Sequence, residues 1–92
     1  MADEADPAAR YMAEVERICD AEPALAPLAG GVLAALKLGI AADSRSFARI
    51  FGIEHALVLR EVQHLAEVEQ LTITKRDERT QRCSYAVASE YC

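Results

Sequence analysis

The fold is decided by residues 43–88, which read DSRSFARIFGIEHALVLREVQHLAEVEQLTITKRDERTQRCSYAVA. Either Asp43 or Ser44 can cap a helix, because each side chain accepts a hydrogen bond from the free amides of the first turn. Gly52 is expected to end that helix, since glycine adopts the left-handed conformation at a helix end without strain. A second, longer helix is predicted to follow over 54–69.

The apolar residues of this stretch indicate which faces are buried. Val58, Val62 and Leu65 recur at helical spacing, so they are expected to face the core. Farther along, two short runs alternate between apolar and polar residues, which is the period of a β-strand. The alternating apolar residues are Leu71, Ile73, Cys83, Tyr85 and Val87. Between the runs, residues 75–82 hold no apolar side chain and are predicted to form a polar loop.

Further elements are predicted upstream of this stretch. A helix is expected over 7–21, because proline at the first helical position lacks only an amide that would be free anyway. Another helix is predicted over 25–38, where Gly30 and Gly31 indicate close packing against a neighbouring helix. Residues 40–42 are expected to form a short edge strand. The fold class is therefore α+β, mostly α: a winged helix-turn-helix with a three-helix core, a β-hairpin wing and an additional N-terminal helix.

The charge of the chain is unevenly distributed. Residues 1–22 hold seven acidic and two basic side chains, a net charge of −5, whereas residues 23–92 hold eight of each. We therefore expect an acidic N-terminal arm and helix over 1–22 and a neutral winged helix-turn-helix domain over 23–92. The amphipathic N-terminal helix can either cover that domain or pair with a second copy. Pairing is favoured, which predicts a homodimer.

No enzymatic centre is expected. His55 and His64 lie nine residues apart on one predicted helix, so they point to opposite sides and cannot share a metal ion. Neither a nucleophile motif nor a glycine-rich phosphate loop is present, and no cofactor is expected. The three cysteines lack metal-ligand spacing, which favours reduced thiols in the cytoplasm. Alanine and glycine dominate the apolar run 24–42, so no membrane span is predicted.

The stretch over roughly residues 28–88 resembles small transcriptional regulators of the multiple-antibiotic-resistance (MarR) type. The segment 44–53, with Phe47, Phe51 and Gly52, is similar to the entry of that family into its helix-turn-helix. Residues 75–82 are similar to its wing. The family usually has a glycine after the recognition helix, where this chain has Glu69, and it usually continues into long dimerisation helices. The resemblance implies a winged-helix domain.

The predicted second helix carries side chains suited to reading DNA. With its apolar face inward, its outward face holds Ala56, Arg60, Gln63 and Glu67. Arg60 can bind guanine and Gln63 can bind adenine in the major groove. Phosphate contacts are expected from the preceding helix and from the wing. The predicted DNA-binding residues are Arg45, Arg49, Arg60, Gln63, Lys75, Arg76, Arg79 and Arg82.

Two functions from different classes fit these features. The first is a small DNA-binding transcriptional regulator that binds double-stranded DNA as a dimer. The alternative is a winged-helix module that binds a protein instead of DNA, with Leu57 and Leu59 on the exposed helix as its contact residues. The even charge balance of residues 23–92 keeps this alternative open, because DNA-binding domains usually carry a basic surface.

Overall fold

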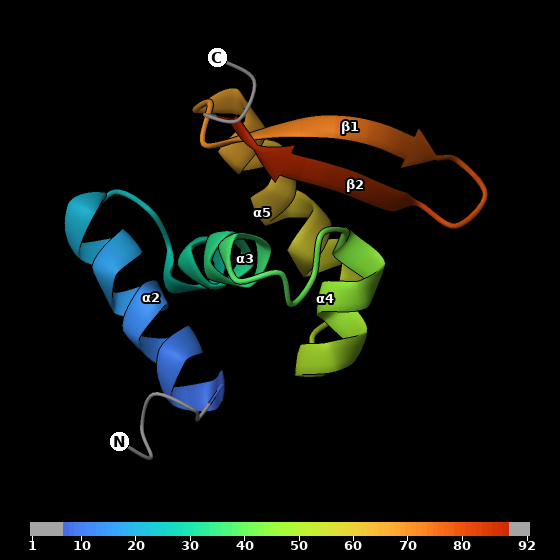
Figure 1. The fold of residues 1–92 in the computed structure, drawn as a ribbon. Helices are drawn as coiled ribbons and strands as arrows, with labels where there is room; N and C mark the ends of the chain where they lie inside the picture. Colours follow the sequence, from blue (N-terminus) through green and yellow to red (C-terminus); the bar gives the residue numbers. More distant parts are fainter. Residues whose placement is uncertain (1–6, 89–92) are drawn as a thin grey trace.

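The structure, a computed structural model, describes residues 7–88. In that range helices are followed by one antiparallel hairpin (Figure 1). The elements are α2 (Pro7–Ala21), α3 (Pro27–Lys37), α4 (Ser44–Phe51), α5 (His55–Glu67), β1 (Leu71–Asp77) and β2 (Arg82–Val87). This mostly helical α+β arrangement is compatible with a winged-helix layout. None of the helices within 7–88 has the length and apolar character that crossing a bilayer requires.

Helix α4 begins and ends where its residues predict. Asp43 caps α4, because its carboxylate accepts a hydrogen bond from the Ser46 N–H at 2.8 Å. Ser44 is instead the first helical residue and is fully buried. Gly52 ends α4 with φ of 65°. The cap therefore leaves the hydroxyl of Ser44 available for contacts outside its own helix.

The core lies where α3, α4 and α5 meet the hairpin. Val58, Val62 and Leu65 are all 0% exposed, which confirms the predicted inward face of α5. Phe47 is the largest fully buried side chain and connects α4 to this cluster. Its ring lies 4.5 Å from that of Phe51, measured between centroids. Contacts across several elements therefore fix the angle between α4 and α5.

Helix α2 packs against α3 through the paired glycines. A Cβ atom added at Gly30 would lie 2.6 Å from Cys19 Sγ, and one at Gly31 would lie 2.7 Å from the Tyr11 hydroxyl oxygen. That hydroxyl donates a hydrogen bond to the Gly31 carbonyl at 3.2 Å. Close helix packing, expected from the glycine pair, is confirmed. Of the two roles predicted for α2, the structure has the helix covering its own chain.

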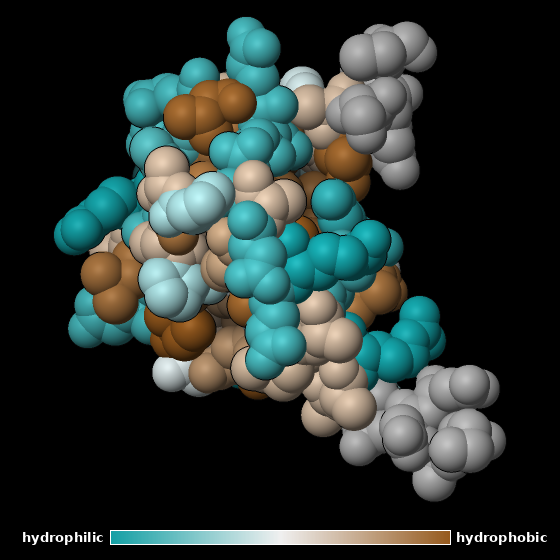
Figure 2. Space-filling model, turned by 90° about the vertical axis from the view of Figure 1, so that its left-hand side faces the viewer, coloured by the Kyte–Doolittle hydropathy of each residue, from teal (hydrophilic) through white to brown (hydrophobic). Residues whose placement is uncertain are grey.

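The outer side of α2 offers a mixed surface. Figure 2 views the molecule from the side on which α2 lies, and hydrophilic and apolar side chains are interspersed there. Met12 on α2 is 54% exposed. Dimerisation through α2 stays a prediction, and so does the division of the chain into residues 1–22 and 23–92.

The hairpin has longer strands and a shorter connecting loop than predicted. Strand β1 continues to Asp77, so the connecting loop is shorter than the predicted 75–82. The polar residues after Ile73 carry no apolar alternation, but they still form backbone hydrogen bonds with β2 after an irregularity at Thr74. The edge strand expected over 40–42 is also wrong: a single bridge joins Asp43 to Ser84. The pairing with β2 ends at this bridge, because α4 begins at the next residue, Ser44.

Glu69, just after α5, has a backbone conformation that favours glycine. Its φ is 63°, in the left-handed region just after α5. That conformation costs a residue with a side chain about 1–2 kcal/mol, and glycine's greater entropy loss offsets part of the gain from replacing it. We expect Glu69→Gly to raise the free energy of unfolding by about 0.5–1 kcal/mol in urea titrations.

The matched control for this prediction is Glu61→Gly, which changes the same residue type in the interior of α5. Glycine in a helix costs about 1 kcal/mol, so this variant should be destabilised. A loss of stability in both variants would contradict the strain assigned to Glu69.

Candidate nucleic-acid interface

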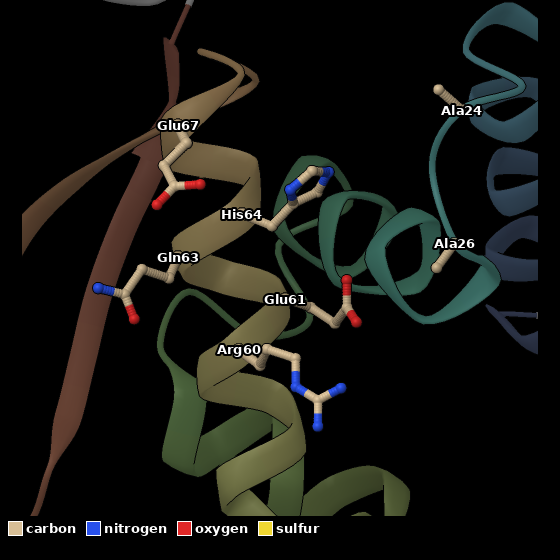
Figure 3. Close-up of a pocket in the computed structure, with 7 residues that line it drawn as sticks. All are labelled: Ala24, Ala26, Arg60, Glu61, Gln63, His64 and Glu67. Carbon is tan, nitrogen blue, oxygen red and sulfur yellow. The ribbon is translucent and has the colours of Figure 1, made fainter.

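The exposed face of α5 borders a cavity of about 470 Å³, here called the α5 cavity. The side chains on α5 face the α2–α3 connection across it, and its lining (Figure 3) comprises Arg60, Glu61, Gln63, His64, Glu67, Ala24 and Ala26. In that view Gln63 points toward the hairpin, whereas Arg60 points away from it. Both side chains are exposed, as predicted. The two candidate base readers therefore diverge from one helix.

A second cavity, of about 300 Å³, lies between α5 and the hairpin and is here called the wing cavity. Gln63 lines this cavity as well as the α5 cavity, so the two adjoin. The hairpin contributes both signs of charge. Its charged lining residues are Arg76, Asp77, Glu78 and Arg82. The outward face of α5 is thus continuous with the turn end of the hairpin.

A third cavity, of about 430 Å³, lies at the corner between α4 and α5 and is here called the corner cavity. Arg82 lines it together with the wing cavity, so the three cavities follow one another along a single surface. The other lining residues are Arg45, Ala48, Arg49, Ile53 and His55. Among the residues that the structure describes, three arginines and no acidic side chain line this cavity.

The structure brings most of the predicted DNA-binding residues to this surface. The residues that line at least one of the three cavities are Arg45, Arg49, Arg60, Gln63, Arg76 and Arg82. Lys75 and Arg79 lie on the exposed hairpin but outside these linings. The α5 cavity also contains Glu61 and Glu67, so the surface is mixed in charge at α5 and basic at the corner.

Two of the arginines are held by contacts within the chain. Arg45 donates from Nε to the carbonyl of Thr80 at 2.8 Å, which ties α4 to the tip of the hairpin. Arg82 Nε lies 3.5 Å from an Asp43 carboxylate oxygen. Within residues 7–88, the side chains of Arg49 and Arg76 make neither a hydrogen bond nor an ion pair. Their donors face solvent and are available to a ligand.

One polar network at the corner was missed by the sequence analysis. The buried Ser44 Oγ accepts a hydrogen bond from the Cys83 N–H at 2.9 Å and lies 2.8 Å from His55 Nε2. It thereby joins the starts of α4 and α5 to β2. His55 lies 11 positions and Cys83 lies 39 positions after Ser44, and no local pattern connects the three residues. Only the tertiary structure reveals this network.

The environment of His55 disfavours its charged form. Burial lowers the pKa of His55, and the positive charges of Arg45 and Arg82 lower it further, while Asp43 acts in the opposite direction. His55 and His64 line different cavities, in agreement with their predicted opposite directions. Residues 7–88 contain no group of three or more His, Cys, Asp or Glu side chains placed to hold a metal ion.

The two leucines assigned to a possible protein contact differ in exposure. Leu57 is 41% exposed on α5, as predicted. Leu59 is only partly exposed and packs against the core cluster beside the wing cavity, so its prediction as an exposed contact residue is wrong. Leu59 flanks the buried Val58 on the side where the hairpin covers α5, which explains the difference.

A separate groove of about 440 Å³ lies at the start of α2, on a different part of the molecule. Among residues 7–88, its lining is apolar and comprises Pro7, Ala8, Tyr11, Met12, Ile40 and Phe51. Ile50, the residue before Phe51 in α4, is 51% exposed.

Comparison of this chain with protein-family models, with curated proteins and with solved structures finds no match, so its classification rests on the geometry described above.

Proposed function

We propose that this chain is a small winged helix-turn-helix protein that binds double-stranded DNA as a transcriptional regulator, similar to the MarR type. In this proposal α5 enters the major groove and the β1–β2 hairpin is the wing. The observation that carries it is the row of three adjoining cavities, which gathers Arg45, Arg49, Arg60, Gln63, Arg76 and Arg82 along one surface.

The roles of these residues follow from their positions. Arg60 and Gln63 are exposed on α5 and have the donors and acceptors that base edges require. Arg49 and Arg76 lie on either side of α5, and within residues 7–88 their side chains make no hydrogen bond or ion pair. They are therefore suited to bind phosphate groups. Lys75 and Arg79 extend the basic groups along the hairpin. A homodimer would present two such surfaces to a palindromic site.

The experiment for base reading starts with selection of bound duplexes from a randomised pool, followed by affinity measurements on the preferred site. We expect Arg60→Ala to reduce discrimination at one base pair by about 1–3 kcal/mol, because the bidentate contact to guanine is lost. Affinity for unrelated duplexes should change much less.

Arg10→Ala is the matched control, since it removes an exposed arginine from α2, away from the three cavities. It should leave base discrimination unchanged. The assignment of Arg60 as a reader fails if Arg60→Ala and Arg10→Ala give the same sequence preference.

A second candidate function is binding to a protein partner, without DNA. The apolar groove at the start of α2, with Met12 54% exposed, favours it, as does the exposed Leu57. A contact surface of this kind predicts that Met12→Glu or Leu57→Glu abolishes association while the fold is retained. The DNA proposal predicts that neither substitution changes affinity for a generic duplex by more than its added charge would.

A further inference from the structure

Of the three adjoining cavities, the corner cavity has the most basic lining. Arg45 and Arg49 reach it from successive turns of α4, and Arg82 reaches it from the start of β2. Asp43 offsets one of these charges through its contact with Arg82. The cavity therefore has an excess of positive charge and is enclosed by elements from both sides of the helix-turn-helix.

Two of the three arginines, Arg45 and Arg82, are positioned before any ligand arrives. The Nε of Arg45 is occupied by the Thr80 carbonyl, and the Nε of Arg82 lies beside Asp43. A guanidinium carries five N–H donors, so each of these side chains keeps terminal donors for an anion. Arg49 makes no hydrogen bond or ion pair through its side chain within residues 7–88. Fixed donors lose less entropy on binding than mobile ones.

His55 adds a group that can change charge at the edge of this cavity. Ser44 Oγ already accepts the Cys83 N–H, and within residues 7–88 its hydroxyl proton has no other acceptor than His55 Nε2. A neutral imidazole with its proton on Nδ1 provides that acceptor. Proton uptake at Nε2 turns this nitrogen into a donor, and the Ser44 hydroxyl proton must then turn away.

The charges around His55 determine when this occurs. Arg45 and Arg49 face it from α4, Arg82 from β2, and Asp43 from the residue before α4. In the free protein burial and the arginines favour the neutral ring. An anion in the cavity neutralises the arginines and therefore favours the imidazolium.

We propose that the corner cavity binds a single phosphodiester group, held by Arg45, Arg49 and Arg82, and that His55 takes up a proton from solvent when the group binds. A phosphodiester suits the cavity because guanidinium forks bind its two free oxygens in pairs. The proposal rests on the proposed function for its source, the DNA backbone. It adds a proton-linked anchor beside the reading helix.

The sign of the pH dependence follows from linkage. If the bound anion raises the pKa of His55, the complex holds more protons than the free protein, and affinity increases as pH falls through the range between the two pKa values. If the pKa of His55 rises by about one unit, the protein with protonated His55 binds the anion about tenfold more tightly than the protein with neutral His55.

The test is an NMR titration of the His55 side chain between pH 5 and 8. Three samples at equal ionic strength are compared: sodium chloride alone, diethyl phosphate, and a short generic duplex. Diethyl phosphate carries one charge at every pH in this range, so the probe itself does not titrate. We expect the His55 midpoint to rise with both the diester and the duplex.

Two variants identify the groups responsible. Arg49→Ala should abolish the rise in the His55 midpoint, and the matched variant Arg10→Ala should preserve it. The affinity of His55→Gln for the duplex should depend less on pH between 5 and 8 than that of the wild type. Circular dichroism of each variant verifies that the fold is retained.

Every outcome is decisive. A rise with the diester but not with the duplex supports the cavity as a phosphodiester site and contradicts its DNA source. Duplex binding by fluorescence anisotropy without any change at His55 retains the proposed function and overturns the proton-linked anchor. No rise with either probe overturns the anchor.

Discussion

Replacing Phe47 by alanine is expected to destabilise the chain by about 3–5 kcal/mol, the largest effect of any single substitution proposed for it. Phe47 is 1% exposed and lies between the ring of Phe51 and the core residues of α3 and α5. A small domain is stable by only about 5–15 kcal/mol, so a large fraction of the stability should disappear. Urea unfolding followed by circular dichroism measures the change.

Phe47→Leu is the control, because it keeps an apolar side chain of similar reach in the same position. Its cost should be clearly smaller than that of Phe47→Ala. The position of Phe47 at the centre of the core would be contradicted by a loss below about 1 kcal/mol in the alanine variant.

Ser44→Ala is the second substitution with a large expected effect. It leaves the Cys83 N–H without an acceptor and removes the partner of His55 Nε2. Because Ser44 is 0% exposed, water cannot replace the lost hydroxyl without rearrangement. An unsatisfied buried donor costs about 1–3 kcal/mol, which should appear in the free energy of unfolding.

The same helix supplies a matched control in Ser46→Ala. The Ser46 hydroxyl donates to Asp43 at 2.9 Å, but its side chain is only partly buried. We expect this variant to lose less than about 1 kcal/mol. If Ser46→Ala proves as costly as Ser44→Ala, the buried network at the corner does not contribute what its geometry indicates.

The sequence predicted the elements whose signals are local. Asp43 and Gly52 mark the ends of α4, and Val58, Val62 and Leu65 mark the inner face of α5, because a cap, a turn and a helical period each extend over a few residues. The glycine pair in α3 likewise indicated a close neighbour.

The features that sequence reasoning missed depend on contacts between distant segments. The far end of β1 pairs with β2 through backbone hydrogen bonds and buries no apolar side chain, so its polar residues carried no strand signal. Leu59 is covered by the hairpin, which its own helix could not reveal. The Ser44–His55–Cys83 network joins three elements and has no sequence period at all.

The candidate site was accessible to prediction in its composition but not in its arrangement. The arginines and Gln63 could be selected from their types and spacing. Gln63 lines the α5 and wing cavities, and Arg82 lines the wing and corner cavities. This arrangement follows only from how the hairpin folds over α5. The concentration of positive charge at the corner also depends on this fold, because residues 23–92 are neutral as a whole.

The measurement that tests the central claim most directly is fluorescence anisotropy of a labelled generic duplex from low to physiological salt. It compares the wild type with Arg49→Ala/Arg76→Ala, whose arginines have no side-chain partner within residues 7–88. Arg10→Ala/Lys37→Ala is the control, since it removes two exposed charges that line none of the three cavities.

We predict binding with a steep salt dependence in the wild type, because each neutralised phosphate releases counterions. The Arg49→Ala/Arg76→Ala variant should lower the slope of log affinity against log salt by roughly 2 units, and the control variant should retain the wild-type slope. Absence of binding at low salt, or equal slopes in the two double variants, would contradict DNA binding by this surface.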